Sequence, residues 1–246
     1  MPASRTHFPR LLLVAALAGA VLPVQAQTCM AKSGTQAAPV VELYTSEGCN
    51  SCPPADRWLS ALKADPSTVA LAFHVDYWDS LGWKDRFASA ANTQRQTRQQ
   101  TVNGSRYNYT PQVVVNGMDR KDWSGITALS ARDPASVQIG LMRSGAQVTA
   151  TVQPNANTKL AAYWAVTEQG HSSAVKAGEN AGVMLKHDHV VREWQAVPAW
   201  AANAGEPATL QFRSGTAVDP THPQQVNLVV VNADTGRPVQ ALKLGC

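Results

Sequence analysis

Apolar residues in the first half of the chain recur with two different spacings. Runs of consecutive apolar residues, typical of buried strands, occupy residues 39–45, 68–78 and 111–117. Helical spacing is clearest at Trp58, Leu59 and Leu62, which would share one face of a helix. We therefore expect helices over residues 55–65, 83–104 and 123–133. Strands that alternate with helices in this order are typical of an α/β sheet.

The pattern changes after Asp133 and Pro134, where short strands separated by turn residues replace the alternation. These stretches cover residues 135–145, 146–154, 159–168, 208–215 and 224–245. Residues 169–205 carry no clear periodicity. Repeated short strands with turns predict a β-sandwich. The pattern thus divides the chain into an α/β domain over residues 38–133 and an all-β, sandwich-like domain over residues 134–246.

The first 26 residues have the composition of a secretory signal peptide. Arg5 and Arg10 form a basic start, residues 11–22 an apolar run, and residues 24–26 a small-residue cleavage site. The apolar run is too short to span a bilayer comfortably. We expect residues 1–26 to be cleaved, and the remaining chain to be periplasmic or secreted from a bacterium, with no membrane association.

The net charge of the chain further limits the classes of partner that we expect it to bind. The two arginines of the signal account for half of the formal net charge of +4, so the remaining chain carries +2. No block of lysine or arginine residues follows, as a nucleic-acid-binding protein would need. We therefore expect no nucleic-acid partner.

Cys49 and Cys52 lie where the first strand gives way to a helix. The positive end of a helix dipole and its free backbone N–H groups lower a thiol pKa, which favours the reactive thiolate. Cys49 would then be the exposed attacking thiol, and Cys52 would resolve the mixed disulfide. A structural disulfide and half of a metal site are the alternatives. However, a disulfide that closes so short a loop stabilises a fold little. A tetrahedral zinc site would need a second pair of ligands, and the sequence has no other CxxC motif.

Two motifs resemble those of glutaredoxins and other thioredoxin-fold proteins. VELYTSEGCNSC, residues 41–52, is similar to their opening strand and active-site loop, and TPQVVVNG, residues 110–117, to their cis-proline loop. The resemblance implies that Thr110 and Pro111 form a cis dipeptide beside the cysteines. Local sequence alone favours a trans bond. The Asn50–Ser51 dipeptide differs from that of thioredoxin and of strong oxidases, so the resemblance leaves the redox potential open.

Together with residues 73–87 and 178–194, these motifs resemble a secreted bacterial family catalogued as domain of unknown function 1223. That resemblance covers nearly the whole chain after the signal. It implies an α/β thioredoxin-like domain over residues 38–133, followed by the sandwich-like domain over residues 134–246.

Two carboxylates are candidate proton relays for the cysteine pair. Asp76 follows a strand whose end should lie near Cys49, and Glu42 lies on the strand that leads to it. Asp76 also fits a packed loop in which polar groups are satisfied. Strand alternation also allows Glu42 to point the other way.

The other two cysteines, Cys29 and Cys246, lie near the two ends of the chain. An even count in a secreted protein suggests that they pair, which would contribute about 4–5 kcal/mol in the chain-entropy model. The alternative is that one of them relays electrons to Cys49 and Cys52.

His187 and His189 lie one residue apart and would share a face of a strand. Such a pair can bind copper or zinc, although surface and capping roles are commoner for paired strand histidines.

These observations favour a thiol–disulfide oxidoreductase that acts on protein thiols or disulfides through Cys49 and Cys52, without a cofactor. One alternative is a copper-binding protein that holds copper(I) on the thiolates for delivery. Another is a non-catalytic interaction module that uses the second domain as its contact face. The sequence leaves the direction of the redox reaction open.

Overall fold

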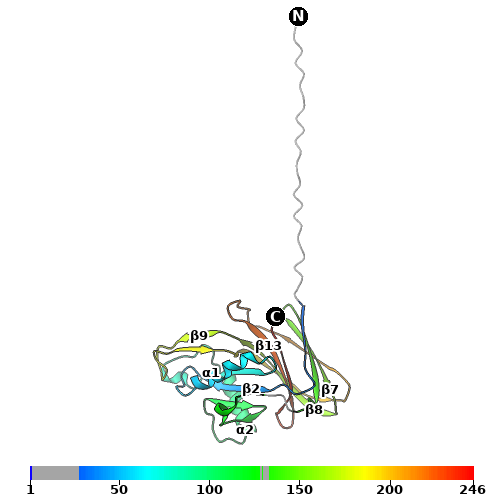
Figure 1. Cartoon of the computed structure of the whole chain (residues 1–246), viewed down its shortest axis with the longest axis horizontal. Helices are drawn as coiled ribbons and strands as arrows, with labels where there is room; N and C mark the ends of the chain where they lie inside the picture. Colours follow the sequence, from blue (N-terminus) through cyan, green and yellow to red (C-terminus); the bar gives the residue numbers. More distant parts are fainter. Residues whose placement is uncertain (2–27, 128, 130–132) are drawn as a thin grey trace.

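The computed structural model describes residues 1, 28–127, 129 and 133–246 (Figure 1). These residues form fourteen strands, two α-helices and three single-turn 3-10 helices. The strands are β1 (Thr28–Lys32), β2 (Val40–Thr45), β3 (Val69–His74), β4 (Gln112–Val115), β5 (Met118–Asp119), β6 (Val137–Ser144), β7 (Gln147–Pro154), β8 (Thr158–Glu168), β9 (His171–Ala174), β10 (Met184–His187), β11 (Val190–Ala202), β12 (Ala208–Arg213), β13 (Gln224–Asn232) and β14 (Pro238–Leu244). The helices are α1 (Pro53–Ala61), α2 (Ala90–Val102), η1 (Leu62–Ala64), η2 (Asp79–Leu81) and η3 (Trp123–Gly125).

One eight-stranded sheet runs through the molecule in the order β14-β13-β8-β11-β3-β2-β4-β5. Strands from the two halves of the chain meet where β3 pairs in parallel with the start of β11, with Ala72 opposite Val190. The backbone N–H of Ala72 donates to the carbonyl of His189 across this junction, at 2.8 Å. The sheet is therefore continuous across the two predicted domains.

A second sheet of four strands, in the order β1-β6-β7-β12, covers the β14-β13-β8-β11 end of the large sheet. Ile139 and Leu141 of β6 share a buried core with Trp164 of β8 and Leu228 of β13. The ring of Trp164 stacks on that of Phe212 of β12, with 5.4 Å between centroids. Alternate inward residues from two facing sheets thus form one core.

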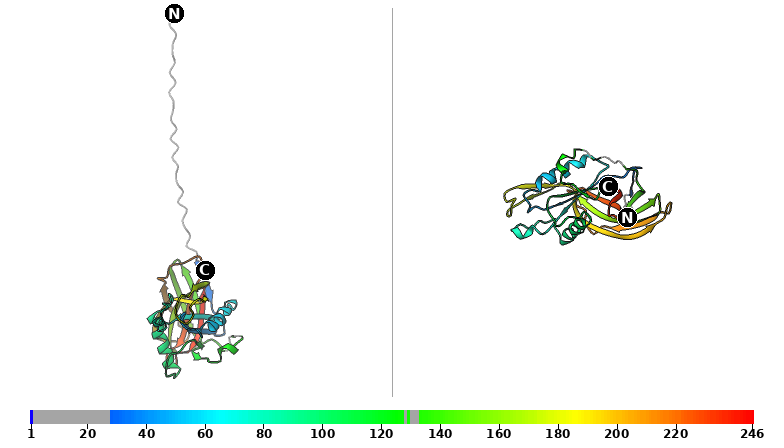
Figure 2. Two further views of the ribbon diagram at one scale, coloured as in Figure 1. Left: turned by 90° about the vertical axis from the view of Figure 1, so that its left-hand side faces the viewer. Right: turned by 90° about the horizontal axis from the view of Figure 1, so that it is seen from below.

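The two α-helices cover opposite faces of the other end of the large sheet (Figure 2, right). Ala55 and Leu59 of α1 pack on Val41 and Leu43 of β2. On the other face α2 places the guanidinium of Arg95 over the apolar surface of the sheet. In Figure 1, the helices and β9 lie at one end of the molecule and β7 at the other.

The predicted fold class, an α/β thioredoxin-like domain followed by a sandwich-like domain, is wrong. The elements in the described residues are mostly strands, fourteen of them, with only two α-helices. The predicted alternation does occur at β2-α1-β3-α2-β4, but β3 then pairs with β11, and the layer beneath the four-stranded sheet is a continuation of the same sheet. Hydrophobic periodicity reports which face of a strand is buried and not which strand lies beside it, so it did not predict this junction.

Two predicted segments also differ in detail. The helix expected over residues 83–104 begins only at Ala90, where the side chain of Ser89 accepts a hydrogen bond from the N–H of Asn92. The helix expected over residues 123–133 is reduced to η3, and residues 128 and 130–132 lie outside the described residues. Residues 169–205, which lack a clear pattern, contain β9, β10 and β11.

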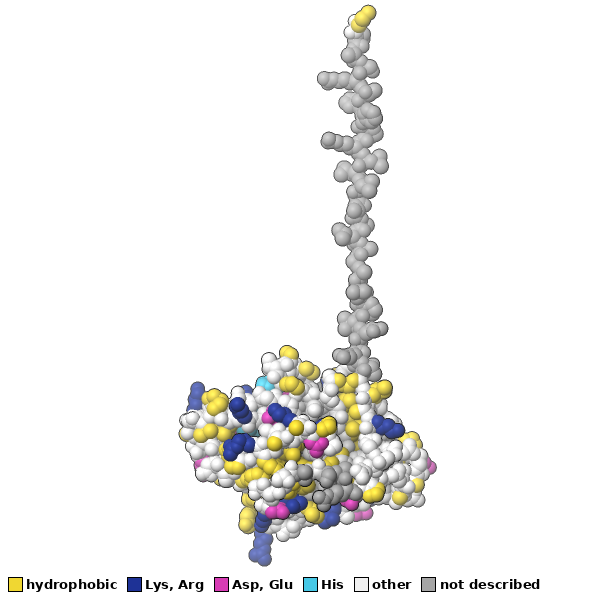
Figure 3. Space-filling model, viewed as in Figure 1, with side chains coloured by type: hydrophobic (Ala, Val, Ile, Leu, Met, Phe, Trp, Pro, Cys, Tyr) yellow, Lys and Arg dark blue, Asp and Glu magenta, His cyan; other side chains and the backbone are white. Residues whose placement is uncertain are grey.

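Residues 2–26 of the predicted signal peptide lie outside the described residues, so the signal peptide stays a prediction. The predicted domain boundary at residue 134 also stays a prediction. Among the helices that the structure describes, none has the length and apolar character needed to cross a membrane. On the face shown in Figure 3, lysine and arginine side chains are interspersed with acidic and uncharged ones.

Candidate functional site

Cys49 and Cys52 form a disulfide in the turn between β2 and α1, with their Cα atoms 5.4 Å apart. Cys52 is the N-cap residue of α1, which begins with two prolines. Its carbonyl accepts hydrogen bonds from the N–H groups of Ala55 and Asp56, at 2.9 and 3.1 Å. Since the prolines have no N–H, the first turn offers the sulfurs few free donors. The helix dipole remains as a favourable influence on a thiolate, but the expected free N–H groups do not.

Both cysteines are fully buried, with 0% exposure, so the expectation that Cys49 is an exposed thiol is wrong. Only the two residues between them, Asn50 and Ser51, reach the surface. The hydroxyl oxygen of Ser51 lies 3.4 Å from Sγ of Cys49. The disulfide is therefore one side chain below the surface.

The connection between β9 and β10 holds the cysteine loop in place. The side-chain amide of Asn180 donates to the carbonyls of Glu47 and Cys49, at 2.9 Å each. The backbone N–H of Asn50 donates to a carboxylate oxygen of Glu179, at 3.1 Å. Residues about 130 positions later in the chain thus cover the disulfide.

Thr110 and Pro111 lie beside the same loop, and the peptide bond between them is cis. Ser51 donates to the carbonyl of Thr110 at 3.5 Å, and Nε1 of Trp78 donates to the Thr110 hydroxyl at 2.8 Å. A Cβ atom added at Gly48 would lie 2.9 Å from Cβ of Trp78, so the loop needs glycine at that position. The structure thus brings Thr110 and Pro111 to the two cysteines, and their catalytic role stays a prediction.

The two predicted proton relays are engaged elsewhere. Glu42 lies on the face of β2 opposite α1, where it pairs with Arg95 and accepts a hydrogen bond from the hydroxyl of Tyr163 at 2.5 Å. Asp76 accepts a hydrogen bond from the hydroxyl of Thr93 in α2, at 2.6 Å. Neither carboxylate has a contact with a cysteine among the described interactions. Alternation along β2 turns Glu42 away from the disulfide.

A buried set of acids and histidines lies behind the cysteine loop instead, and sequence reasoning did not assemble it. Nδ1 of His74 lies 2.6 Å from a carboxylate oxygen of Asp85, and both side chains are fully buried. Nε2 of His187 lies 3.4 Å from Oε1 of Glu47, and the two histidine rings are 5.0 Å apart. Asp56 of α1 is buried beside them. We call these five residues the buried acid–base cluster.

Burial and neighbouring charge pull the pKa values within this cluster apart. Burial raises the pKa of Asp56 above its usual range, which favours its neutral form. Burial would also raise the pKa of Asp85, but His74 outweighs it and holds that pKa below its usual value. In turn Asp85 raises the pKa of His74 although burial opposes this. The pKa of Glu47 is lowered, because the polar groups of His187, Ser173 and Trp83 around its carboxylate outweigh its burial.

The structure separates the two predicted metal candidates. The ring of His187 packs on that of His74, while His189 has a left-handed backbone (φ 57°) and its Nδ1 lies 3.1 Å from Nε2 of Gln169. In the described part of the chain, no three histidine, cysteine or acidic side chains converge as a metal site would require.

Cys29 and Cys246 are bonded to each other, with their Cα atoms 6.5 Å apart. The bond links β1 to Cys246, the second residue after the end of β14, so the C-terminus lies next to β1 in Figure 1. It therefore joins the edge of the four-stranded sheet to the β14 edge of the large sheet.

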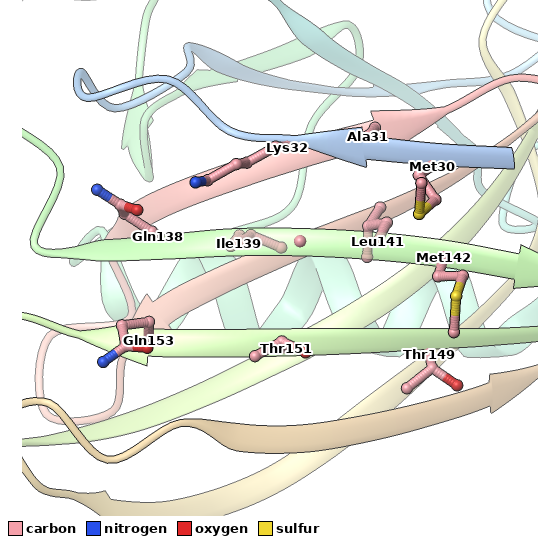
Figure 4. A pocket seen from close by; sticks show the side chains of 11 residues that line it. Met30, Ala31, Lys32, Gln138, Ile139, Leu141, Met142, Thr149, Thr151 and Gln153 are labelled. Carbon is pink, nitrogen blue, oxygen red and sulfur yellow. The ribbon is translucent and has the colours of Figure 1, made fainter.

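A shallow pocket of about 620 Å³ lies on the outer face of β1, β6 and β7 (Figure 4). Its rim carries the side chains of Met30 and Met142, which face each other across the strand pair. Lys32 is the only charged residue among those that line it. None of the cysteines or the buried acid–base cluster lines this pocket, so it is not part of the candidate site.

A family model described as "Protein of unknown function (DUF1223)" matches residues 40–232, which is most of the chain. The chain belongs to the DUF1223 family. The match includes the cysteine loop, the Thr110–Pro111 dipeptide and the segment that carries Glu179 and Asn180. Both sides of residue 134 therefore belong to the same family match.

Two solved structures are similar to this DUF1223 protein. A crystal structure of an Agrobacterium tumefaciens protein, determined as a structural genomics target, aligns with a TM-score of 0.66 and 29% identity, covering 86% of this chain and 96% of that one. HBP35 of Porphyromonas gingivalis aligns with a TM-score of 0.58 and 16% identity, over 86% of this chain and 76% of that one. No curated protein matches the chain. The Agrobacterium structure extends across both predicted domains, in agreement with a single β-rich architecture.

Proposed function

We propose that this protein is a thiol–disulfide oxidoreductase that exchanges the Cys49–Cys52 disulfide with cysteines of other proteins. The observation that carries the proposal is the position of this disulfide, which lies at the start of α1 with Ser51 and the carbonyl of Thr110 beside it. A bridge over so short a loop stabilises a fold little, because the entropic gain grows with loop length. Redox chemistry explains the pair better than a structural role does.

The exchange needs no cofactor. When the pair acts as oxidant, a substrate thiolate attacks Sγ of Cys49, the bond to Cys52 breaks, and Cys52 leaves as a thiolate. A second substrate thiolate then attacks the substrate sulfur of the mixed disulfide and releases Cys49, so that two electrons pass from substrate to enzyme. In the reverse direction the reduced pair opens a substrate disulfide through the same intermediate.

Burial of both sulfurs implies that the loop opens before substrate reacts. Asn50 and Ser51 are the exposed part of the loop, and their contacts with Glu179 and Thr110 are two surface hydrogen bonds of 3.1 and 3.5 Å. Once Ser51 moves, the Thr110 carbonyl is free to accept an N–H from an extended substrate chain. A peptide segment around a cysteine is therefore the substrate class that fits.

The reduction potential of the Cys49–Cys52 pair tests the proposal. We expect a value above about −300 mV, in the range of exchanging pairs, measured by equilibration with a dithiol buffer and acid trapping. A value near −120 mV would indicate an oxidant, and one near −270 mV a reductant, roughly as for known proteins of each kind.

A second measurement uses a reduced or scrambled protein substrate. The wild-type protein should speed its oxidation or disulfide rearrangement, and Cys49→Ser should abolish this effect. The matched control is the double variant Cys29→Ser/Cys246→Ser, which removes the other disulfide and should keep the activity. A pair that resists reduction below about −300 mV and does not react with protein substrates would be structural, and the proposal would fail.

Periplasmic or secreted location forms part of this proposal. Disulfides persist in oxidising compartments, and the protein contains two of them. Export by the predicted signal peptide would supply that environment.

A further inference from the structure

The β9–β10 hairpin is attached to the rest of the molecule without strand pairing. Its two strands pair with each other, and among the described strands neither joins the four-stranded or the eight-stranded sheet. Side chains therefore hold it in place. In the turn of the hairpin, Asn180 and Glu179 bind the cysteine loop. At its base, His171 and His187 lie directly opposite each other, and both are buried.

His171 contacts an acid and a second histidine at this base. Its Nε2 lies 3.0 Å from Oε2 of Glu168, the last residue of β8, and the same oxygen accepts a hydrogen bond from Arg192 of β11 at 3.0 Å. The ring of His222 stacks on that of His171, with 3.7 Å between centroids and 28° between planes. The ring of Phe87 also packs on His171, with centroids 4.8 Å apart. Contacts from four other segments of the chain thus hold His171 in one position.

This arrangement fits the neutral form of His171. When Nε2 carries the proton it donates to the Glu168 carboxylate, and Nδ1 is buried without a hydrogen-bond partner among the described residues. A second proton would place an N–H at Nδ1 with no acceptor there and a positive charge in a buried ring, and both cost free energy. Burial accordingly lowers the pKa of His171 from its ordinary value of 6.5, with His222 and Arg192 acting in the same direction and Glu168 against them.

The charged groups around this histidine pair balance each other. The groups that face the pair are Glu168 of β8, Arg192 of β11, Arg86 from the segment before α2, His187 of β10 and Asp219 from the segment before β13. His187 is paired with Glu47 of the cysteine loop, at 3.4 Å. The two arginines thus oppose two acids, Glu168 and Asp219. Each proton taken up by His171 or His222 therefore adds a positive charge that no neighbouring acid is left to compensate.

An opened hairpin base removes this cost. There His171 is solvated, it no longer stacks on His222, and its pKa returns towards 6.5. Below about pH 6.5 the open form then binds more protons than the closed form, so a fall in pH favours opening and a rise in pH favours closure. Because Asn180 connects the hairpin to the cysteine loop, opening of the base loosens the cover of the disulfide.

We propose that the β9–β10 hairpin is a pH-sensitive cover of the Cys49–Cys52 disulfide, and that the stacked pair of His171 and His222 releases it in acid. Opening of the hairpin is independent of the proposed function, whereas its consequence, faster disulfide exchange in mildly acidic surroundings, rests on it. At neutral pH the closed hairpin keeps both sulfurs buried.

Hydrogen exchange of the whole protein at pH 7.5 and pH 5.5 tests the opening. After correction for the intrinsic pH dependence of exchange, β9 and β10 should lose protection at pH 5.5, while β8 and β13 should change much less. His171→Gln should abolish this loss, because its side-chain amide can donate to Glu168 but does not titrate. Equal protection of the hairpin at both pH values in the wild type would overturn the proposal.

His222→Phe provides a second variant, in case His171→Gln does not fold. It keeps an aromatic ring in the stack and cannot take up a proton. The loss of hairpin protection between pH 7.5 and pH 5.5 should therefore be smaller than in the wild type. A loss as large as that of the wild type would show that charge on His222 has no part in the release.

Reduction by a water-soluble phosphine connects the opening to the cysteines. The phosphine is oxidised to its oxide with oxygen from water, the Cys49–Cys52 bond breaks, and two thiols form. Thiol trapping and peptide mass analysis count the two disulfides separately. The ratio of the wild-type rate to that of His171→Gln cancels the pH dependence of the reagent, and it should rise as the pH falls from 7.5 to 5.5, by up to about tenfold per pH unit for one proton. A constant ratio would contradict the proposed cover.

The outcomes separate this proposal from the redox function. If the hairpin opens in acid but the disulfide does not exchange with protein substrates, the redox function fails and the pH-sensitive cover stands. If protein substrates exchange while protection of the hairpin does not depend on pH, the cover fails and the redox function stands.

Discussion

Arg95 carries a largely buried charge between α2 and the central sheet. Its guanidinium pairs with Glu42 and lies 4.1 Å from the ring centroid of Tyr163 and 4.8 Å from that of Phe73. A guanidinium suits this place because it offers planar donors to the carboxylate and a flat face to the aromatic rings. The same carboxylate, predicted as a proton relay, is thus explained as the partner of Arg95.

Replacement of Arg95 by alanine should destabilise the protein by about 3–5 kcal/mol, because it leaves the buried Glu42 carboxylate without its counter-charge. The free energy of unfolding, from urea denaturation, measures this. Arg98→Ala is the matched control, since Arg98 lies on the same helix but is exposed, and it should change stability by about 0.5 kcal/mol or less. Equal effects of the two variants would show that the Arg95–Glu42 pair contributes nothing specific.

His189 makes stability depend on pH. Burial lowers its pKa from 6.5 to about 4. Between these values the unfolded chain binds a proton that the folded protein does not, so acidification favours unfolding and stability rises with pH. The full effect is about 3 kcal/mol, present above pH 6.5 and lost as the pH falls towards 4.

The variant His189→Asn is compared with the wild type, because asparagine tolerates the left-handed backbone at this position and does not titrate. Between pH 7.5 and pH 4.5, the wild type should lose about 2 kcal/mol more free energy of unfolding than His189→Asn does. Urea denaturation of both proteins at the two pH values decides this. The same loss in both would mean that His189 does not titrate differently in the folded and unfolded states.

At the scale of elements, sequence predicted the strands and helices close to the cysteines well and the rest less well. β2, α1, β3 and β4 occur where apolar runs and helical spacing placed them. These elements are buried on a fixed face, so their periodicity is strong. The β9–β10 hairpin was missed because its short strands, His171–Ala174 and Met184–His187, carry polar residues and are separated by a long turn. The hairpin covers the cysteine loop, and a contact between segments so far apart in the chain cannot be predicted from the local sequence of either one.

The hairpin should control how fast the disulfide reacts, since Asn180 connects it to the cysteine loop through two hydrogen bonds of 2.9 Å. Asn180→Ala should speed reduction of the Cys49–Cys52 bond by dithiothreitol about tenfold, because two lost hydrogen bonds lower the free energy of opening by roughly 1–3 kcal/mol. Asn203→Ala, which removes an exposed side-chain contact to Glu206, is the control and should react like the wild type. An unchanged rate in Asn180→Ala would mean that the loop opens without the hairpin.

At the scale of the whole molecule, the candidate site combines parts that sequence could find with parts that it could not. The cysteine pair and the Thr110–Pro111 dipeptide were found because each has a local motif. Asp56, Asp85 and the covering Asn180 have no motif of their own, and they acquire a role only when β3, β10 and α1 meet. The junction of β3 with β11 that allows this meeting depends on pairing between residues more than 100 positions apart.

The link between the ends of the chain gives the last prediction. The Cys29–Cys246 disulfide closes a loop with a sequence separation of 217, for which the chain-entropy model gives about 5 kcal/mol of stabilisation. The double variant Cys29→Ser/Cys246→Ser should lose most of this free energy in urea denaturation, and β1, held to β6 along one edge only, should lose protection from hydrogen exchange first. The reduction potential of the Cys49–Cys52 pair should stay unchanged, because four strands of the large sheet separate β2, which leads to that pair, from the edge strand β14. A shifted potential, together with slower recycling of the active pair, would instead support electron relay through the terminal cysteines.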